Sequence, residues 1–257
     1  MRPAICIFTF GLVLVFGFSG CDSPVINESG SPSTPQTAIG DASKPQLDYS
    51  RPLPGPAGFV SVIDNPYFPL PVGTTWYYEG PSDGASETIQ VTVTNQTQNI
   101  MGVKTTVVLD RVYASGDLTE ETLDFYAQDT VGNVWYFGEN TTTLENGHIT
   151  GHEGRWRAGD DEAQAGIIME AAPQVGDTYR EEYLPGVAED QATVISLDET
   201  VSVEYGHFEH CLKTDNFTAL EPDVLENKWY APGIGLVMDM VTTGGTERHG
   251  LVQILYR

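Results

Sequence analysis

The chain has 257 residues, of which 36 are Asp or Glu and 12 are Lys or Arg, and its formal net charge at pH 7 is −24. A charge of this size and sign repels phosphate backbones and anionic lipid surfaces, and the sequence has no basic stretch of the kind that nucleic-acid binding needs. The composition therefore excludes nucleic acid as a partner.

The start of the chain is typical of a secreted bacterial lipoprotein. A basic residue precedes an apolar run over residues 5–20, which is shorter than the roughly 20 apolar residues of a membrane-spanning helix. The run ends in FSGC at 18–21, which resembles the lipobox, in which the cysteine is diacylated and becomes the first mature residue; Phe18 replaces the usual Leu. We predict a signal peptide over residues 1–20 and lipidation of Cys21, with an ordinary cleaved signal or an uncleaved anchor as alternatives.

This prediction places the protein in the cell envelope. Two acyl chains are enough for stable anchoring, so the membrane would be a partner through the lipid and the folded part would be extracytoplasmic. The sequence leaves open which membrane holds the anchor.

Residues 21–58 differ in composition from the rest of the chain. They contain seven prolines with many Ser and Gly residues, and such a segment buries too little apolar surface to offset its ordering entropy. We predict a disordered stalk over 21–58 and a folded domain over 59–257, whose roughly 200 residues suffice for a real core.

The three cysteines leave one thiol in the mature chain. Cys6 lies in the predicted signal peptide and Cys21 is the predicted lipidation site, so only Cys211 remains and an internal disulfide is excluded. We expect Cys211 to be buried, because free cysteine is among the most buried residue types; the alternative is a reactive thiol.

The first part of the folded domain resembles its second part in sequence. PVGTTWYYEG at 71–80 matches QVGDTYREEY at 174–183, and two further matches follow in the same order, pairing Gly102 with Gly206 and Tyr126 with Tyr230, at offsets of 103 or 104 residues. Three ordered matches at one spacing indicate an internal duplication. We predict copies at about 66–140 and 170–245, separated by an insert at 141–169.

Each copy reads as antiparallel strands. In TIQVTVTNQT, Ile89, Val91 and Val93 alternate with polar residues, which is the period of a half-solvated strand. Only residues 161–172 show a weak helical period. The sequence predicts an all-β fold: two tandem duplicated antiparallel meanders that form a sandwich, a half-barrel or a long curved sheet.

Several segments together resemble an uncharacterised family of secreted or lipid-anchored bacterial β-rich proteins. They are DNPYFPLPVGTTWYYEG, DFYAQDTVGNVWYFGEN, EGRWRAGDDEAQAGIIM, QVGDTYREEYLPGVAED, YGHFEHCLKT and KWYAPGIGLV, and they cover nearly all of 62–238. The resemblance implies this architecture and an extracytoplasmic location. It supplies no catalytic residue.

Two clusters suggest metal ligands. His207, His210 and Cys211 offer imidazole and thiolate to Zn²⁺, although alternation on a strand would point His210 away from the other two unless a bulge intervenes. The insert and its flanks offer oxygen ligands to Ca²⁺ but lack the EF-hand pattern, so we favour a solvated polar connection. The carboxylates of this segment are Glu139, Glu145, Glu153, Asp160, Asp161 and Glu162, and His148 and His152 lie among them. We expect no cofactor, with Ca²⁺ or Zn²⁺ as alternatives.

The sequence has none of the catalytic or nucleotide-binding motifs that we sought. These are G-x-S-x-G, H-E-x-x-H, the P-loop and the Rossmann fingerprint. Carboxylate pairs such as Asp124 with Glu139, or Glu182 with Glu189, would suit a glycoside hydrolase only if about 5 to 9.5 Å apart. The catalytic residues are unknown, and a non-enzymatic role is favoured.

Binding is better motivated, because aromatic faces stack on sugars and line apolar pockets. Alternation along GNVWYFGE suggests that one aromatic pair of this strand is exposed. The candidate ligand-binding residues are Trp135, Tyr136, Glu139, Trp156 and Trp229. We expect a lipid-anchored envelope module that binds a glycan or an apolar ligand or has a structural role; an envelope hydrolase or an apolar carrier is the alternative.

Overall fold

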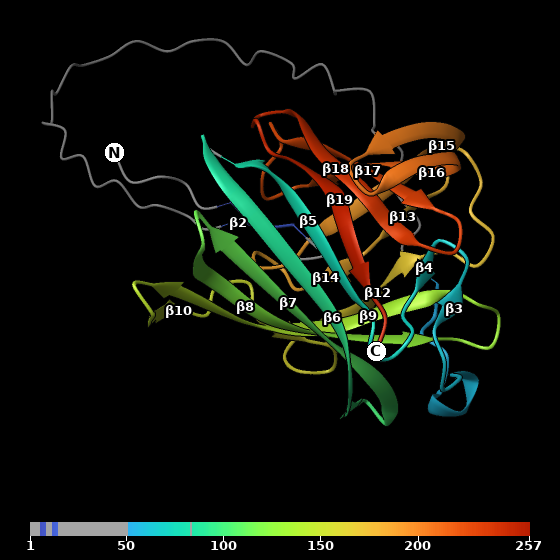
Figure 1. Cartoon of the computed structure of the whole chain (residues 1–257). Helices are drawn as coiled ribbons and strands as arrows, with labels where there is room; N and C mark the ends of the chain where they lie inside the picture. Colours follow the sequence, from blue (N-terminus) through green and yellow to red (C-terminus); the bar gives the residue numbers. More distant parts are fainter. Residues whose placement is uncertain (1–5, 9–11, 15–50, 83) are drawn as a thin grey trace, which may run out of the picture.

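The computed structural model describes residues 6–8, 12–14, 51–82 and 84–257 (Figure 1). Cys21 and most of the predicted signal peptide and stalk lie outside these residues. Within them, no helix has the length and apolar character needed to cross a membrane.

The described chain is nearly all β-structure, which confirms the predicted fold class. Its one helical element is the 3-10 turn η1 (Pro56–Gly58). The strands are β1 (Cys6–Phe8), β2 (Leu12–Leu14), β3 (Asp64–Asn65), β4 (Phe68–Pro69), β5 (Thr75–Ser82), β6 (Ala85–Ile100), β7 (Val103–Ala114), β8 (Asp117–Gln128), β9 (Val134–Glu145), β10 (His148–Gly151), β11 (Trp156–Arg157), β12 (Gln164–Met169), β13 (Thr178–Arg180), β14 (Glu182–Tyr183), β15 (Asp190–Val203), β16 (Gly206–Thr218), β17 (Leu225–Ala231), β18 (Gly235–Thr243) and β19 (Arg248–Leu255).

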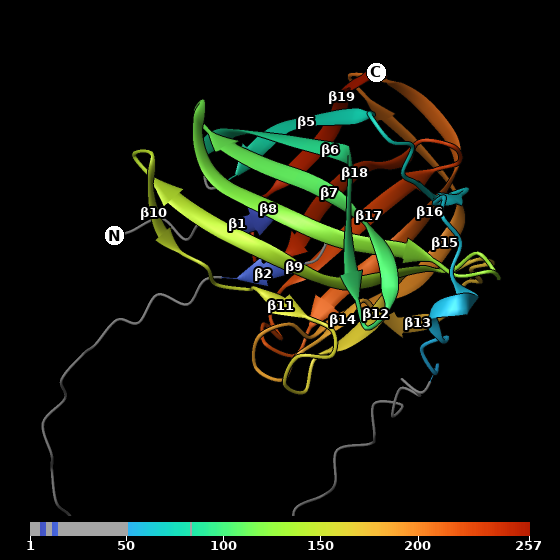
Figure 2. The same ribbon diagram turned by 90° about the horizontal axis from the view of Figure 1, so that it is seen from below.

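Fifteen of these strands form one antiparallel sheet that curls into a nearly closed barrel (Figures 1 and 2). The strand order is β13-β15-β16-β17-β18-β19-β5-β6-β7-β8-β9-β12-β14, with β10 and β11 paired to β9. The two ends meet because β13 and β14 are consecutive in the chain. Three residues of β13 pair with β15, and two residues of β14 pair with β12, so this short stretch joins both edges.

The two segments predicted to be copies have the same arrangement. Strands β5 to β9 form one meander, and β13, β15, β16, β17 and β18 form another, with β19 joining β18 to β5 and β12 joining β9 to β14. The hydrogen bonds also correspond: the Gly73 amide donates to the Val93 carbonyl, and the Gly176 amide donates to the Val194 carbonyl, both at 2.8 Å. The internal duplication itself stays a prediction from the sequence.

Side-chain alternation sends apolar residues into the barrel. Ile89, Val91 and Val93 on β6 are buried, as the sequence predicted. The adjoining turn has positive φ at Met101 (51°) and Gly102 (82°), as a two-residue hairpin requires.

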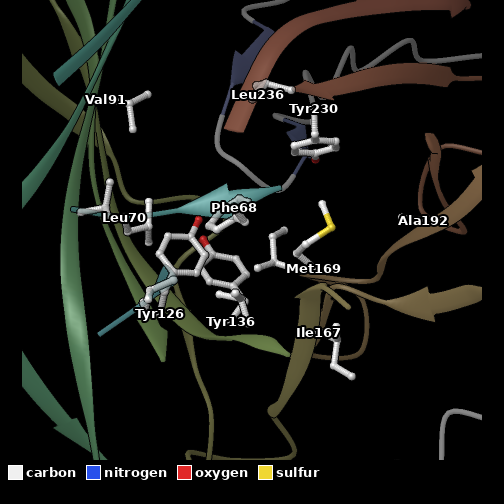
Figure 3. Packing of buried hydrophobic residues seen from close by; sticks show 14 of the residues in the cluster. Phe68, Leu70, Val91, Tyr126, Tyr136, Ile167, Met169, Ala192, Tyr230 and Leu236 are labelled. Carbon is white, nitrogen blue, oxygen red and sulfur yellow. The ribbon is translucent and has the colours of Figure 1, made fainter. Parts of the chain in front are cut away.

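One core spans both halves of the barrel (Figure 3). The rings of Tyr126 and Tyr136 stack at 4.8 Å, and Phe68 packs edge-on against Tyr126 at 5.3 Å. Tyr230 and Leu236, from the second half, lie across from them (Figure 3). The interior is therefore occupied by large side chains.

The weak helical period of residues 161–172 does not produce a helix, since this segment contains β12, whose Ile167 pairs with Trp135 on β9. The expectation of an exposed aromatic pair on β9 was wrong, because both faces of this strand are buried from Val134 to Glu139. Phe59 from the segment after η1 packs edge-on against Phe137 and covers one of those faces.

Candidate functional site

Four carboxylates from β7, β8 and β9 lie inside the first half of the barrel. We call them the first acidic cluster: Asp110, Glu120, Asp124 and Glu139, all buried. The Tyr136 hydroxyl lies 2.7 Å from both Asp124 Oδ1 and Glu139 Oε2. One hydroxyl proton can serve only one acceptor, so the second short contact requires a proton on one of the two carboxyl groups.

Burial is the main influence on this cluster. It raises the pKa of Asp124 from 3.8 to about 7, against the opposing hydrogen bond from Tyr136. Burial likewise raises the pKa of Glu120 from 4.5 to about 8. The pKa values of Asp110 and Glu139 are also raised by burial and by neighbouring carboxylates, including Asp124. The first acidic cluster therefore retains protons near neutral pH.

A second group of carboxylates lies in the other half around one lysine. We call it the second acidic cluster: Glu181, Asp190, Glu226 and Asp239, all buried. Lys228 Nζ lies 3.3 Å from Glu226 Oε2. Burial alone would lower the pKa of Lys228, but Glu226, Glu181 and the other two carboxylates outweigh it and raise this pKa.

In the predicted duplication, Lys228 aligns with Asp124 of the first cluster, just as Tyr230 aligns with Tyr126. The two halves thus carry side chains of opposite charge type, a lysine and an aspartate, at positions that the repeat makes equivalent. The second cluster holds its own buried cation, whereas the first carries protons instead.

A buried histidine links the two halves. His249 on β19 lies with Nδ1 3.1 Å from Asp239 Oδ1 and Nε2 3.0 Å from Glu87 Oε2. Burial lowers its pKa, but the hydrogen bonds and charges of Asp239 and Glu87 raise it from 6.5 to about 10. His249 is therefore a protonated imidazolium that hydrogen-bonds to Asp239 through Nδ1 and forms an ion pair with Glu87 through Nε2.

The carboxylate pairs considered for hydrolysis fall in unsuitable places. Asp124 and Glu139 do converge, but only 0% and 1% of their surfaces are exposed. Glu182 is buried and accepts a hydrogen bond from Trp156 at 2.8 Å, whereas Glu189 is half-buried and accepts a hydrogen bond from the Gly186 amide at 2.8 Å. None of these four carboxylates lines either of the two pockets described below.

The five residues predicted to bind a ligand are all packed in the barrel wall or core. Trp135, Tyr136, Glu139, Trp156 and Trp229 are each at most 6% exposed. The Trp135 indole donates to Asp129 at 2.8 Å, and the Trp156 ring lies edge-on to Tyr136 at 5.3 Å. Their observed contacts are structural, and ligand binding by them stays a prediction.

The predicted metal ligands are not brought together. Cys211 is fully buried, as expected, while His207 and His210 are exposed. A bulge does occur beside His210, but His210 contacts Asp198 at 2.6 Å and His207 contacts Ser202 at 2.8 Å. No group of three His, Cys, Asp or Glu side chains in the described ranges has a metal-binding arrangement.

Replacing Tyr136 by Phe should test the hydrogen-bonded pair. The substitution leaves two buried carboxyl groups without their shared partner, and we expect the free energy of unfolding to fall by about 1 to 3 kcal/mol. Urea denaturation near pH 6 measures this loss. Tyr77→Phe, at a half-buried position on β5, is the control, and an equal effect of both variants would contradict the proposed role of Tyr136.

Comparisons with known proteins give only distant similarity. No family model and no curated protein matches the sequence. A predicted exported protein with a YmcC-like fold from Bacteroides fragilis is 17% identical, with 74% of this chain and 98% of that chain covered and a TM-score of 0.44. A predicted lipoprotein from Parabacteroides distasonis is 13% identical, with the same coverage and a TM-score of 0.40.

Proposed function

We propose that the protein is a lipid-anchored module of the bacterial cell envelope that binds at the outer surface of its barrel. The observation that supports this most is the occupied interior. The aromatic core (Figure 3) and the two acidic clusters take the place of a ligand cavity. At the junction of β12 and β13, a pocket of about 50 Å³ has room for a few water molecules only. An internal apolar cargo would need a larger cavity.

The anchor is testable through the two cysteines. The full-length protein should incorporate an alkyne-labelled fatty acid in its bacterial host and partition into detergent on Triton X-114 phase separation. Cys21→Ala should abolish both properties, because the acyl chains are the predicted membrane attachment. The control Cys211→Ala removes the buried thiol and should remain labelled. Labelling that persists in Cys21→Ala would refute the anchor.

Native mass spectrometry tests the filled interior. The full-length lipoprotein, released from detergent, should show the mass of the acylated chain without a further ligand. An additional lipid, glycan or metal that leaves only when the protein denatures would contradict surface binding and favour a carrier.

A further inference from the structure

A cleft of about 570 Å³ lies where the β5–β6 hairpin, the start of β19 and the tip of the β15–β16 hairpin meet. Its lining is Glu79, Gly80, Pro81, Gly84, Ala85, Ser86, Val203, Glu204, Arg248, Gly250 and Val252. Gly250 lies between the fully buried His249 and Leu251, so alternation turns it to the outer face of the barrel. The cleft is therefore on the outside.

Glycines allow the strands and the hairpin tip to come close here. A Cβ on Gly80 would clash with the carbonyl oxygen of Arg248 at 1.7 Å, and a Cβ on Gly250 would come within 3.1 Å of Val203. The floor of the cleft is thus largely backbone. Three charged residues also line the cleft: Glu79, Glu204 and Arg248, all exposed.

An aromatic group adjoins the cleft; we call Tyr205, Phe208 and Tyr256 the aromatic tip. The rings of Tyr205 and Phe208 are nearly parallel, with an interplanar angle of 6° and centroids 6.4 Å apart. Tyr205 is 40% exposed and Tyr256 is 68% exposed. The Tyr205 amide donates to the Leu251 carbonyl at 3.0 Å, which fixes the tip beside the cleft floor.

The β6–β7 hairpin, which is the equivalent of β15–β16 in the first half, has different surroundings. Its turn at Met101 and Gly102 packs near Pro56, and the Arg157 side chain donates to the Asn99 carbonyl at 3.0 Å. This first turn is therefore braced by other parts of the chain, and its outermost side chain is aliphatic. The second turn carries aromatic rings toward solvent.

These features fit one ligand class. Flat aromatic faces suit the apolar faces of sugar rings, carboxylates accept hydrogen bonds from sugar hydroxyls, and a guanidinium donates them. A cleft of this volume is within the usual range for small-ligand sites. The net charge of −24 disfavours acidic polymers. We propose that the cleft and the aromatic tip bind a neutral oligosaccharide.

This inference rests on the proposed surface-binding function and names its ligand. The test uses the full-length lipoprotein in a detergent without a sugar headgroup. Neutral gluco-, manno- and galacto-hexasaccharides are the probes, an acidic oligogalacturonate is the charge control, and saturation-transfer NMR and calorimetry report binding. We expect at least one neutral hexasaccharide to bind below about 10 mM and the acidic one to bind at least about tenfold more weakly.

Variants locate the site. Tyr205→Ala combined with Phe208→Ala should weaken binding by about tenfold or more. Because Phe208 is half-buried, Tyr256→Ala provides a second variant at a position 68% exposed, with an expected loss of a fewfold. Met101→Ala, at the equivalent turn, should bind like wild type.

Two results would overturn the inference: no binding of any neutral hexasaccharide by the folded wild type, or unchanged affinity in both aromatic variants. Either result would leave the fatty-acid labelling and the native mass as they are, so the envelope module itself would fail only on those separate measurements.

Discussion

Replacing Lys228 by Met is expected to lower the free energy of unfolding by about 3 to 5 kcal/mol at neutral pH. Lys228 is the cation of the second acidic cluster, and its Nζ lies 3.3 Å from Glu226. Methionine fills a similar volume but leaves Glu226 and Glu181 buried without a counter-ion. Such an uncompensated charge costs far more than the loss of a surface ion pair.

The loss caused by Lys228→Met should depend on pH. With Lys228 present, the pKa values of Glu226 and Glu181 are about 7, because burial raises them more than Lys228 lowers them. Acidification protonates these carboxyls and makes the missing cation less costly. Urea denaturation at about pH 5.5 and pH 8 should therefore show the larger loss at pH 8.

Lys213→Met is the matched control. Lys213 is half-buried on β16, with its ammonium 4.6 Å from the centre of the Trp229 ring. Its replacement should cost about 0.5 to 1 kcal/mol, the value of an exposed cation–π contact. Equal losses for the two lysine variants would show that the second acidic cluster does not depend on Lys228.

Asp124→Asn, unlike Lys228→Met, should stabilise the protein relative to wild type, and this stabilisation should grow as the pH rises. The unfolded chain ionises Asp124 near 3.8, whereas burial raises the folded-state pKa to about 7. Between these values the folded protein holds a proton that the unfolded chain has released, so wild-type stability falls with rising pH and levels off above about pH 7. Asparagine does not titrate and escapes this loss.

The geometry at Tyr136 accommodates an amide in place of the Asp124 carboxyl group. In the Asp124→Asn variant, the new side-chain NH₂ can donate to the Tyr136 oxygen while the Tyr136 hydroxyl donates to Glu139, which preserves both short contacts. We expect the stability of Asp124→Asn relative to wild type to increase by about 2 to 3 kcal/mol between about pH 5 and pH 8.

Urea denaturation across this pH range measures the difference. The range stays above the sequence pI of about 4.2, where low net charge would promote aggregation. Asp117→Asn changes an exposed carboxylate on the same strand and should follow the wild-type curve. A parallel curve for Asp124→Asn would mean that Asp124 is already ionised in the folded protein.

The sequence predicted the features that depend on local periodicity. Ile89, Val91 and Val93 alternate with polar residues and are buried together, because on a strand the residues two apart share a face. The same rule failed on β9, where Phe59 covers the face predicted to be open. That contact comes from a segment far away in sequence, and no local pattern reports it.

The carboxylate pairs show the same limit of prediction from local sequence patterns. Asp124 and Glu139 were correctly considered as a pair, and they meet across β8 and β9. Glu182 and Glu189 have a similar spacing to many other acids in this chain, yet Glu182 is buried and Glu189 is only half-buried. Burial, which raises the pKa of Asp124 and removes it from substrates, depends on the whole barrel.

Lys228 and His249 were missed altogether. Both are cations placed among carboxylates by strands from different parts of the sheet. A signal for Lys228 was present in ENKWYA, where a lysine stands two residues before Tyr230 on the face that the repeat assigns to the interior. Aligning it with Asp124 would have indicated a buried charge of opposite sign.

The place of β19 also has a consequence for biosynthesis. This strand, residues 248–255, lies between β18 and β5 and thereby unites the second meander with the first (Figure 1). During synthesis or export, β5 emerges about 170 residues before its neighbour, and contacts so distant in sequence form slowly. The incomplete chain exposes the edge of β5, where another chain could pair. Protection of that edge by an export chaperone would keep nascent molecules from joining one another until the last strand arrives.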